Sequence, residues 1–412
     1  MKKSPVSLPT VLITILLTLI VQSFSFFRDF PTSPVCGRVV SIFAELSVLI
    51  NCDSAVFMKD AQDPSRVFEG ISVYQDRPAH SVLAWILATT MKLFGVPNQS
   101  REIVGTSGQT TIYETLYYGS YILINLTVVV ISVLLALKFV FGTLNWKSIK
   151  FQKYFALAIL LIVAANELTK TFFWTPHSQM FNVLLPTLSL ALLVNRSKIS
   201  KLSQFVTLNA ITLMLMFFYP LFGLLFGLLL FTRYARFVQR LITISLFSSV
   251  YVFYPQILEV LGGKHRNFVV EEYRQYVWVL DSIRENELIT NLTLNLTSFG
   301  STFPILPTIG LILVFIVLTI VTSRSQYFTR EKFRTDLLPY LLFAFIYLVA
   351  LSLMGYYSRR LTLGLYIFLE LLAIKFFLKV FDGRFNKTGQ IFLALILGLL
   401  VGSWIWTNGP LE

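Results

Sequence analysis

The chain has 412 residues, of which 55% are hydrophobic and only 13% are charged. Soluble domains usually carry about 25% charged residues, so this apolar surplus exceeds what a soluble core can hold. The formal net charge is +13, but the basic residues lie in short segments between apolar stretches, which is typical of a topology signal. The composition therefore predicts a multi-pass membrane protein and excludes a soluble enzyme and a nucleic-acid partner.

Apolar stretches of the length needed to cross a membrane, about 20 residues, recur along the chain. We expect about eleven spans, at residues 8–27, 118–141, 154–170, 179–194, 203–232 as a short pair broken at Tyr219-Pro220, 241–261, 303–323, 337–354, 361–381 and 389–407. The short pair also fits a re-entrant hairpin. The sequence thus predicts an all-α transmembrane helix bundle, a single integral membrane domain over residues 1–412.

Clusters of Lys and Arg between the spans orient the chain, because these residues accumulate on the cytoplasmic side. They are Lys2/Lys3, Lys138/Lys147/Lys150/Lys153, Arg196/Lys198/Lys201, Arg233/Arg236/Arg240, Arg324/Arg330/Lys332/Arg334 and Lys375/Lys379/Arg384/Lys387. Placing all six clusters inside predicts a cytoplasmic N-terminus, an external C-terminus and two long outer loops, at residues 28–117 and 262–302. Loops carry function more often than the elements they connect, so we expect function on the outer face.

The first outer loop holds an apolar stretch, residues 79–94, that is too short to span a membrane comfortably. With His80, Trp85 and Lys92 interspersed, it predicts a helix lying in the membrane interface. Cys36 and Cys52 are the only cysteines. They pair if both face an oxidising compartment, and two separate buried thiols fit the sequence equally well.

The same loop carries four aspartates, a tyrosine and an arginine within 25 residues. They are Asp53, Asp60, Asp63, Tyr74, Asp76 and Arg77. A carboxylate at the outer mouth of a membrane protein can act as a general base on a hydroxyl, or join a second carboxylate in holding a divalent metal against a diphosphate. A solvated acidic loop without chemistry is the alternative.

This acidic first loop, followed by an interfacial helix, resembles the GT-C superfamily of membrane glycosyltransferases. Asp53 followed by Phe57, by the Asp63-Pro64 step and by the Arg77-Pro78 step is similar to the first-loop aspartate motif of that superfamily. The resemblance implies transfer of a sugar from a polyprenyl-phosphate donor to a glycan, lipid or protein acceptor, at the outer face of a bacterial cell membrane. It leaves a divalent metal possible.

The resemblance leaves two candidates for the base, because the superfamily's aspartate commonly follows the first span closely, where Asp29 stands here. We favour Asp53, because Asp60 lies at i+7 on the same helical face and supports it. Asp63 and Arg77 are then candidates for substrate binding. The sequence does not reveal the sugar or the acceptor.

Two further groups of polar residues lie at the outer ends of spans. His177 and Gln179 follow the third span and are candidates for contact with a phosphate, although a lone loop histidine is more often just solvated. Arg359 and Arg360 precede the tenth span, on the side otherwise poor in basic residues. Their guanidinium groups match phosphate oxygens, so the pair predicts a phosphate clamp, with anchoring to lipid headgroups as the alternative.

The leading hypothesis is therefore an inverting membrane glycosyltransferase with Asp53 as its base. The rival is a polytopic transporter or lipid flippase, in which the acidic loop is a gate. Transporters usually show ionisable or broken segments near mid-membrane, and here Glu370 and Pro220 are the main features of that kind. A non-catalytic membrane scaffold is a third possibility.

Overall fold

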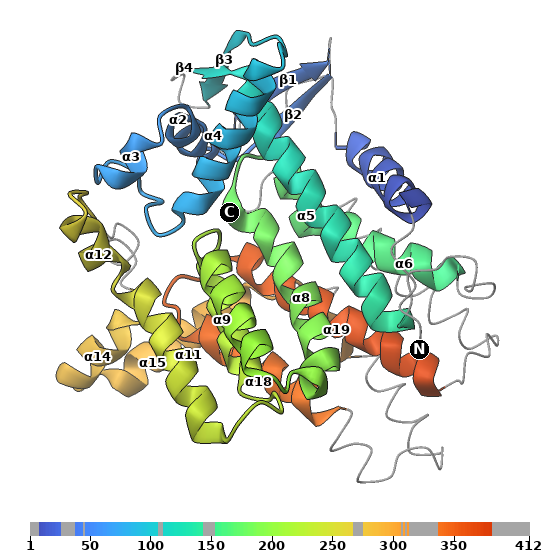
Figure 1. The fold of residues 1–412 in the computed structure, drawn as a ribbon, viewed down its shortest axis with the longest axis vertical. Helices are drawn as coiled ribbons and strands as arrows, with labels where there is room; N and C mark the ends of the chain where they lie inside the picture. The colour runs from blue at the N-terminus through green and yellow to red at the C-terminus, as the bar shows by residue number, and fades with distance from the viewer. Residues whose placement is uncertain are drawn as a thin grey trace.

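The computed structural model describes residues 8–25, 38–43, 46–105, 110–142, 153–266, 275–305, 308–309, 311–312 and 337–380. Within these ranges the chain is mostly helical, as expected from its composition. This agrees with the expected all-α class, although the first outer loop also contains a four-stranded sheet that the sequence did not predict. The strands and the helices α2 (Ser54–Gln62), α3 (Ser65–Phe68) and α4 (Pro78–Leu93) gather at the upper end in Figure 1, above the helical body.

The sheet consists of two antiparallel hairpins joined edge to edge. Its strands are β1 (Arg38–Phe43), β2 (Leu46–Ile50), β3 (Ser100–Gly105) and β4 (Thr110–Glu114), in the spatial order β2-β1-β3-β4. Val39 pairs with Leu49 on one side and with Val104 on the other. The strands are rich in Val, Ile and Thr, which favour a pleated surface. The sheet therefore connects the start of the first outer loop to its end.

Between the two hairpins the loop forms three helices. They are α2 (Ser54–Gln62), α3 (Ser65–Phe68) and α4 (Pro78–Leu93). The helix expected at residues 79–94 is confirmed as α4, which begins at Pro78, a residue whose fixed φ suits the first turn of a helix. Its far end exposes Leu93 and Phe94, at 82% and 84%. Apolar side chains this exposed fit the predicted position in a membrane interface.

Two helical segments are long and apolar enough to cross a membrane. They are α5 (Thr115–Phe141) and the continuous segment Ser178–Lys198, which contains α8 (Phe181–Asn195). A third candidate is the pair α11 (Phe237–Val252) and α12 (Tyr254–Val260), bent by 53°. The described part of the chain thus supplies two or three such spans, and the expected number of about eleven is not reached.

Several stretches expected to span the membrane form shorter apolar helices. They are α1 (Leu8–Ser23), α6 (Lys153–Ala164), α9 (Leu202–Met216), α10 (Leu224–Leu229) and α18 (Leu338–Ser352). The break expected at Tyr219-Pro220 is present, because α9 ends before it and a short 3₁₀ helix, η4 (Pro220–Gly223), follows. The expected span 389–407 lies outside the described residues, and 303–323 lies largely outside them.

The expected span 154–170 is interrupted at Asn166. Its side-chain nitrogen donates to the carbonyls of Ile162 and Val163, both at 2.9 Å, and its oxygen accepts the backbone N–H of Thr169 at 2.9 Å. Asn166 thus ends α6 and caps the short helix α7 (Glu167–Phe172). A single continuous span is wrong here, because this local capping competes with continuation of the helix.

The body of the molecule is built around α5, α8 and α19 (Arg359–Val380), which pack against one another. The long teal α5 runs from the sheet down along this body (Figure 1). Asn182 on α8 ties the helices together, because its side-chain nitrogen donates to the carbonyl of Arg360 at 2.7 Å and its oxygen accepts the hydroxyl of Tyr347 at 2.7 Å. The upper ends of α8 and α19 therefore meet below α2 and α4.

Two further helices lie in the segment between residues 262 and 302. They are α14 (Val277–Arg284) and α15 (Leu288–Ser301), both from the second outer loop. Helix α14 carries the tryptophan that connects this loop to the helical body. Its Trp278 ring nitrogen donates to the carbonyl of Leu353 at 3.0 Å, which places this loop against the end of α18.

Candidate functional site

Asp53 lies where the first hairpin turns into α2. It is the N-cap residue of that helix, its backbone N–H donates to the side-chain oxygen of Asn51 at 2.8 Å, and its side chain remains 33% exposed. The preceding Cys52 is disulfide-bonded, and the one other cysteine of the sequence, Cys36, lies outside the described residues. Asp53 is thus fixed by its backbone while its carboxylate reaches solvent.

His177 approaches Asp53 from the connection between α7 and the 3₁₀ helix η2 (Ser178–Met180). Its Nε2 lies 3.4 Å from Oδ2 of Asp53, and its side chain is 2% exposed. Its Nδ1 accepts the backbone N–H of Gln179 at 3.0 Å, which assigns the ring proton to Nε2. Burial lowers the pKa of His177 to about 4. The imidazole is therefore neutral near pH 7, with its protonated nitrogen close to the carboxylate.

Tyr74 is the second partner of Asp53. Its ring stacks on Phe57 with 4.3 Å between centroids, and its hydroxyl is hydrogen-bonded to the carboxylate of Asp53. Burial and the neighbouring carboxylate raise the pKa of Tyr74, so the phenol keeps its proton and donates. Burial alone would raise the pKa of Asp53, but the hydrogen bonds from His177 and Tyr74 and the charge of Arg360 lower it to about 2. Asp53 is ionised.

Two arginines bring positive charge to this cluster. Arg77 lies 5.0 Å from the ring centroid of Tyr74, and its Nη1 donates to the hydroxyl of Ser178 at 2.9 Å. Its Nε contacts Asp76 at 3.1 Å. Arg360 donates to the hydroxyl of Tyr356 at 2.8 Å, and its charge acts on Asp53, Tyr74 and His177. The structure thus brings a first-loop residue and a residue of α19 to one place.

Arg359 is directed elsewhere. Its Nη2 lies 2.6 Å from the carboxylate of Glu167, which is 2% exposed, whereas the Arg359 side chain is 39% exposed. A buried carboxylate requires such a partner, because an unpaired buried charge is strongly destabilising. The two arginines predicted to clamp one phosphate therefore have separate surroundings, and Arg360 is the one whose charge acts on Asp53.

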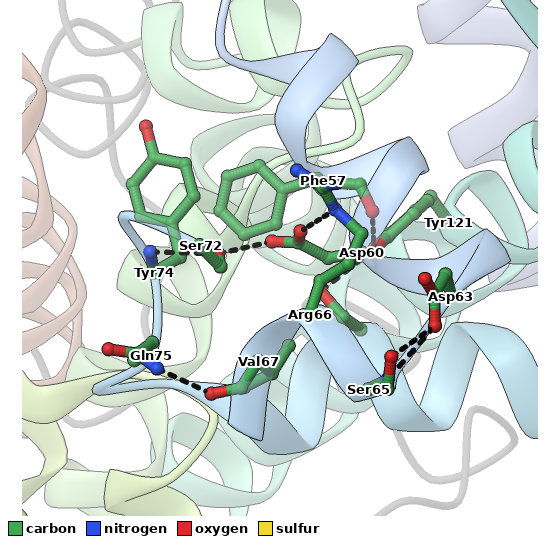
Figure 2. Close-up of polar contacts among 11 residues, drawn as sticks. Phe57, Asp60, Asp63, Ser65, Arg66, Val67, Ser72, Tyr74, Gln75 and Tyr121 are labelled. Carbon is green, nitrogen blue, oxygen red and sulfur yellow. Dashed lines mark hydrogen bonds and ion pairs between the residues drawn. The ribbon is translucent and has the colours of Figure 1, made fainter. Parts of the chain in front are cut away.

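Asp60 and Asp63 have partners within their own loop (Figure 2). Asp60 is buried, contacts Nε of Arg66 at 3.3 Å and accepts the hydroxyl of Ser72. Burial raises its pKa. Asp63 accepts the backbone N–H of Ser65 at 3.2 Å and its hydroxyl at 2.7 Å. These contacts fix α2, α3 and the segment after them, so the geometry gives both aspartates a structural use. Their predicted roles in chemistry and substrate binding stay predictions.

Gln179 joins the cluster through the helix break. Its side-chain oxygen accepts the hydroxyl of Tyr219 at 3.0 Å, and the charges of Arg77 and Arg360 also act on that tyrosine. The break before Pro220 therefore places the side chain of Tyr219 at the site. Asp29, the other candidate base, lies outside the described residues.

Gln75 was not singled out in the sequence, yet it connects the two outer loops. Its side-chain nitrogen donates to the carbonyls of Val67 at 2.8 Å and Lys264 at 2.9 Å, and its oxygen accepts the backbone N–H of Arg266 at 2.8 Å. Figure 2 shows its amide directed at Val67. Tyr251 adds a bond from its hydroxyl to the carbonyl of Asp76 at 3.0 Å. The second loop thus holds the segment that carries Tyr74 and Arg77.

His80 is a further residue whose position the sequence did not reveal. It is buried on α4 among the rings of Phe57, Tyr121 and Phe181. In the part of the chain that the structure describes, neither of its ring nitrogens has a hydrogen-bond partner. Burial lowers its pKa to about 3, with smaller effects from His177 and Arg77. It is a neutral packing partner of Phe57, the ring on which Tyr74 stacks.

The donor set around Asp53 does not fit a divalent metal. Among the described residues no three His, Cys, Asp or Glu side chains come close enough together to hold a metal ion. The groups nearest to Asp53 are an N–H donor, a phenol and the charge of Arg360, and a nearby arginine charge disfavours a bound cation. Hydrogen-bond donors and guanidinium groups suit an anion such as phosphate.

Comparison with known proteins leaves the site to be interpreted from its own geometry. No protein-family model, no curated protein sequence and no solved structure matches this chain. The resemblance to the GT-C superfamily therefore rests on the first-loop residues alone.

Proposed function

We propose that this protein is a membrane glycosyltransferase that uses a lipid-phosphate-linked sugar, with Asp53 as the general base. The observation that carries the proposal is the ionised, partly exposed carboxylate of Asp53, held by the buried His177 at 3.4 Å and by Tyr74, beside the charge of Arg360. A base and phosphate-binding groups in one place are what such a transfer requires.

The transfer needs one bond made and one broken. The acceptor hydroxyl oxygen attacks the anomeric carbon, the bond from that carbon to the phosphate oxygen breaks, and the electron pair leaves with the phosphate. The hydroxyl proton passes to Asp53, and attack from the opposite face inverts the anomeric centre. Arg360 and Arg77 stabilise the negative charge that grows on the departing phosphate. His177 and Tyr74 orient the carboxylate.

Placement of the site at the outer face of a bacterial cell membrane is part of the proposal. The disulfide at Cys52 supports an outer location, because disulfides persist in oxidising compartments. The exposed apolar end of α4 supports a position at the membrane surface, where a lipid-linked donor is reached. In this arrangement the N-terminus is cytoplasmic.

The decisive experiment replaces Asp53 by Asn, which keeps the size of the side chain and removes the charge. Purified full-length protein in nanodiscs is given polyprenyl-phosphate-linked mannose, glucose, galactose and arabinose in parallel, with membrane extract as the acceptor source. Loss of a general base lowers the transfer rate by about 10²- to 10⁴-fold. Glu285→Gln is the matched control, because its exposed carboxylate lies at the end of α14 and has no role in the proposed site, so its loss leaves the rate within about twofold.

Asp29→Asn is tested under the same conditions, because the sequence offers two candidates for the base. If Asp29→Asn abolishes transfer and Asp53→Asn does not, the assignment of the base is wrong while the activity stands. If neither substitution affects any measured activity, the glycosyltransferase proposal is abandoned, and transport across vesicles becomes the function to test.

A further inference from the structure

The negative charge of Asp53 is stabilised by groups from three separate parts of the chain. His177 comes from the connection between α7 and η2, Tyr74 from the segment between α3 and α4, and Arg360 from the start of α19. Arg77 stands beside Tyr74, 5.0 Å from its ring centroid. Cys52, the neighbour of Asp53 in sequence, is disulfide-bonded and does not titrate. Every titrating partner of Asp53 in this cluster therefore stabilises its negative charge.

This arrangement lowers the basicity of the Asp53 carboxylate. A carboxylate stabilised by donors and by a positive charge is a weak proton acceptor, and the pKa of Asp53 is about 2. A general base works best when its pKa lies nearer the operating pH. In the protein without substrate, the groups around Asp53 thus weaken it as a general base, although its exposure and position suit that role.

His177 is not free to relieve this effect. Its Nδ1 accepts the backbone N–H of Gln179, so the ring proton stays on Nε2, 3.4 Å from Asp53. Tyr74 is likewise a fixed donor, because its ring is stacked on Phe57. Arg360 differs from both, since it carries a full charge and its side chain is partly exposed. Its influence on Asp53 is the one that a bound anion can cancel.

We propose that a phosphate group bound against Arg360 and Arg77 neutralises the positive charge beside Asp53 and so converts Asp53 into an effective base. The inference rests on the proposed function, because it joins the base and the phosphate-binding arginines of that proposal. Its consequence is an order of events: the phosphate-bearing donor binds first, and only then is the acceptor hydroxyl deprotonated. The phosphate is either that of a lipid carrier or a free phosphate ion.

The test follows the ionisation of Asp53 directly, by infrared difference spectra of the full-length protein in zwitterionic nanodiscs. Subtracting the spectra of Asp53→Asn isolates the carboxylate band of Asp53. Titrations are run without anion, with inorganic phosphate, and with polyprenyl monophosphate in the nanodisc. A positive charge at about 4–6 Å lowers a carboxyl pKa by about 1–3. An anion that cancels this charge therefore raises the pKa again. We expect the bound anion to raise the midpoint from about 2 by about one unit or more.

The two arms with phosphate identify its source. A shift with polyprenyl monophosphate but not with inorganic phosphate supports a lipid-carried phosphate, and a shift with both supports a site for the phosphate group itself. An unchanged Asp53 midpoint in both arms overturns the inference. Because this reading needs no sugar transfer, a shift combined with full activity of Asp53→Asn would leave the charge coupling in place and remove Asp53 as the base.

Neighbouring arginines supply the controls. Arg360→Gln raises the Asp53 midpoint without any anion and leaves little further rise when phosphate is added, whereas Arg360→Lys keeps the wild-type midpoint. The double variant Glu167→Gln/Arg359→Gln removes an ion pair that lies apart from Asp53, and its neutral partners avoid an unpaired buried charge. We expect it to titrate like the wild type. A rise in this variant as large as in Arg360→Gln would contradict the assignment to Arg360.

Discussion

The polar contacts of Asn125 offer a test of how the site is supported from within α5. Its side-chain nitrogen donates to three backbone carbonyls, those of Phe172 at 3.1 Å, Phe173 at 2.9 Å and Thr175 at 3.0 Å. These carbonyls belong to the turn that leads from α7 to His177. Asn125 is buried, so water cannot replace it. Asn125→Leu therefore removes the support of that turn while keeping a similar volume.

The expected loss follows from the number of donors. An amide nitrogen carries two hydrogens, and side-chain hydrogen bonds within membranes contribute about 0.6 kcal/mol each on average, up to about 1.7. Two such bonds give about 1–3 kcal/mol of lost unfolding free energy. The side-chain oxygen of Asn125 has no hydrogen-bond partner among the described residues, and the substitution removes this buried polar atom. Its removal offsets part of the loss, so we expect a value toward the lower end of this range.

Asn209→Leu is the matched control on α9. Asn209 is also buried in an apolar helix, but its nitrogen makes a single local bond, to the carbonyl of Phe205 at 2.8 Å. Unfolding of both variants by SDS titration in mixed micelles, followed by tryptophan fluorescence, gives the two free energies. Asn125→Leu destabilises the protein by more than Asn209→Leu. Equal losses would refute the reasoning, because they would show that the three-carbonyl contact adds nothing to burial.

Three further outcomes follow from other contacts. A Cβ on Gly364 would lie 2.5 Å from the side-chain oxygen of Asn182, whereas one on Gly227 has open space, so Gly364→Ala lowers the unfolding midpoint in SDS and Gly227→Ala does not. Gln75→Leu releases the second outer loop, which limited proteolysis detects as faster cleavage near residues 262–266 than in the wild type. The pKa of His80 is lowered to about 3 by burial, so the unfolded state, with a pKa of about 6.5, takes up the proton first. The contribution of His80 to the free energy of unfolding therefore falls as the pH drops from about 6.5 to about 3. His80→Phe removes this pH dependence and flattens the measured free energy of unfolding over that range. An unchanged slope counts against a buried neutral His80.

Composition and periodicity were sufficient for the two longest apolar helices, but not for the number of spans. The stretches at 118–141 and 179–194 appear as α5 and α8 with nearly the expected bounds, because long apolar runs have few alternatives to a helix. The break at Tyr219-Pro220 and the helix α4 were also predictable, since proline restricts the residues around it. The interruption at Asn166 was not, because one asparagine with two local acceptors ended a span that hydrophobicity alone continued.

The sheet was missed for a different reason. Its strands are five or six residues long, and β1 pairs with β3 across some 60 residues of sequence. Strand pairing is a long-range property, and short runs rich in Val, Ile and Thr within a loop do not reveal their partners. The sequence indicated the polar character of the first outer loop, and the tertiary structure determined that a sheet anchors the helix carrying Asp53.

The sequence by itself therefore determined which residue types are available near the ends of the helices: the aspartates of the first loop, His177 and the two arginines at the start of α19. Only the tertiary structure decided which of them meet. It brought His177 to 3.4 Å from Asp53, occupied Asp60 with Arg66, and paired Arg359 with Glu167 while leaving Arg360 to act on Asp53. Adjacent residues on a helix point in different directions, about 100° apart, so the choice between Arg359 and Arg360 depends on how α19 is rotated against α7 and α8.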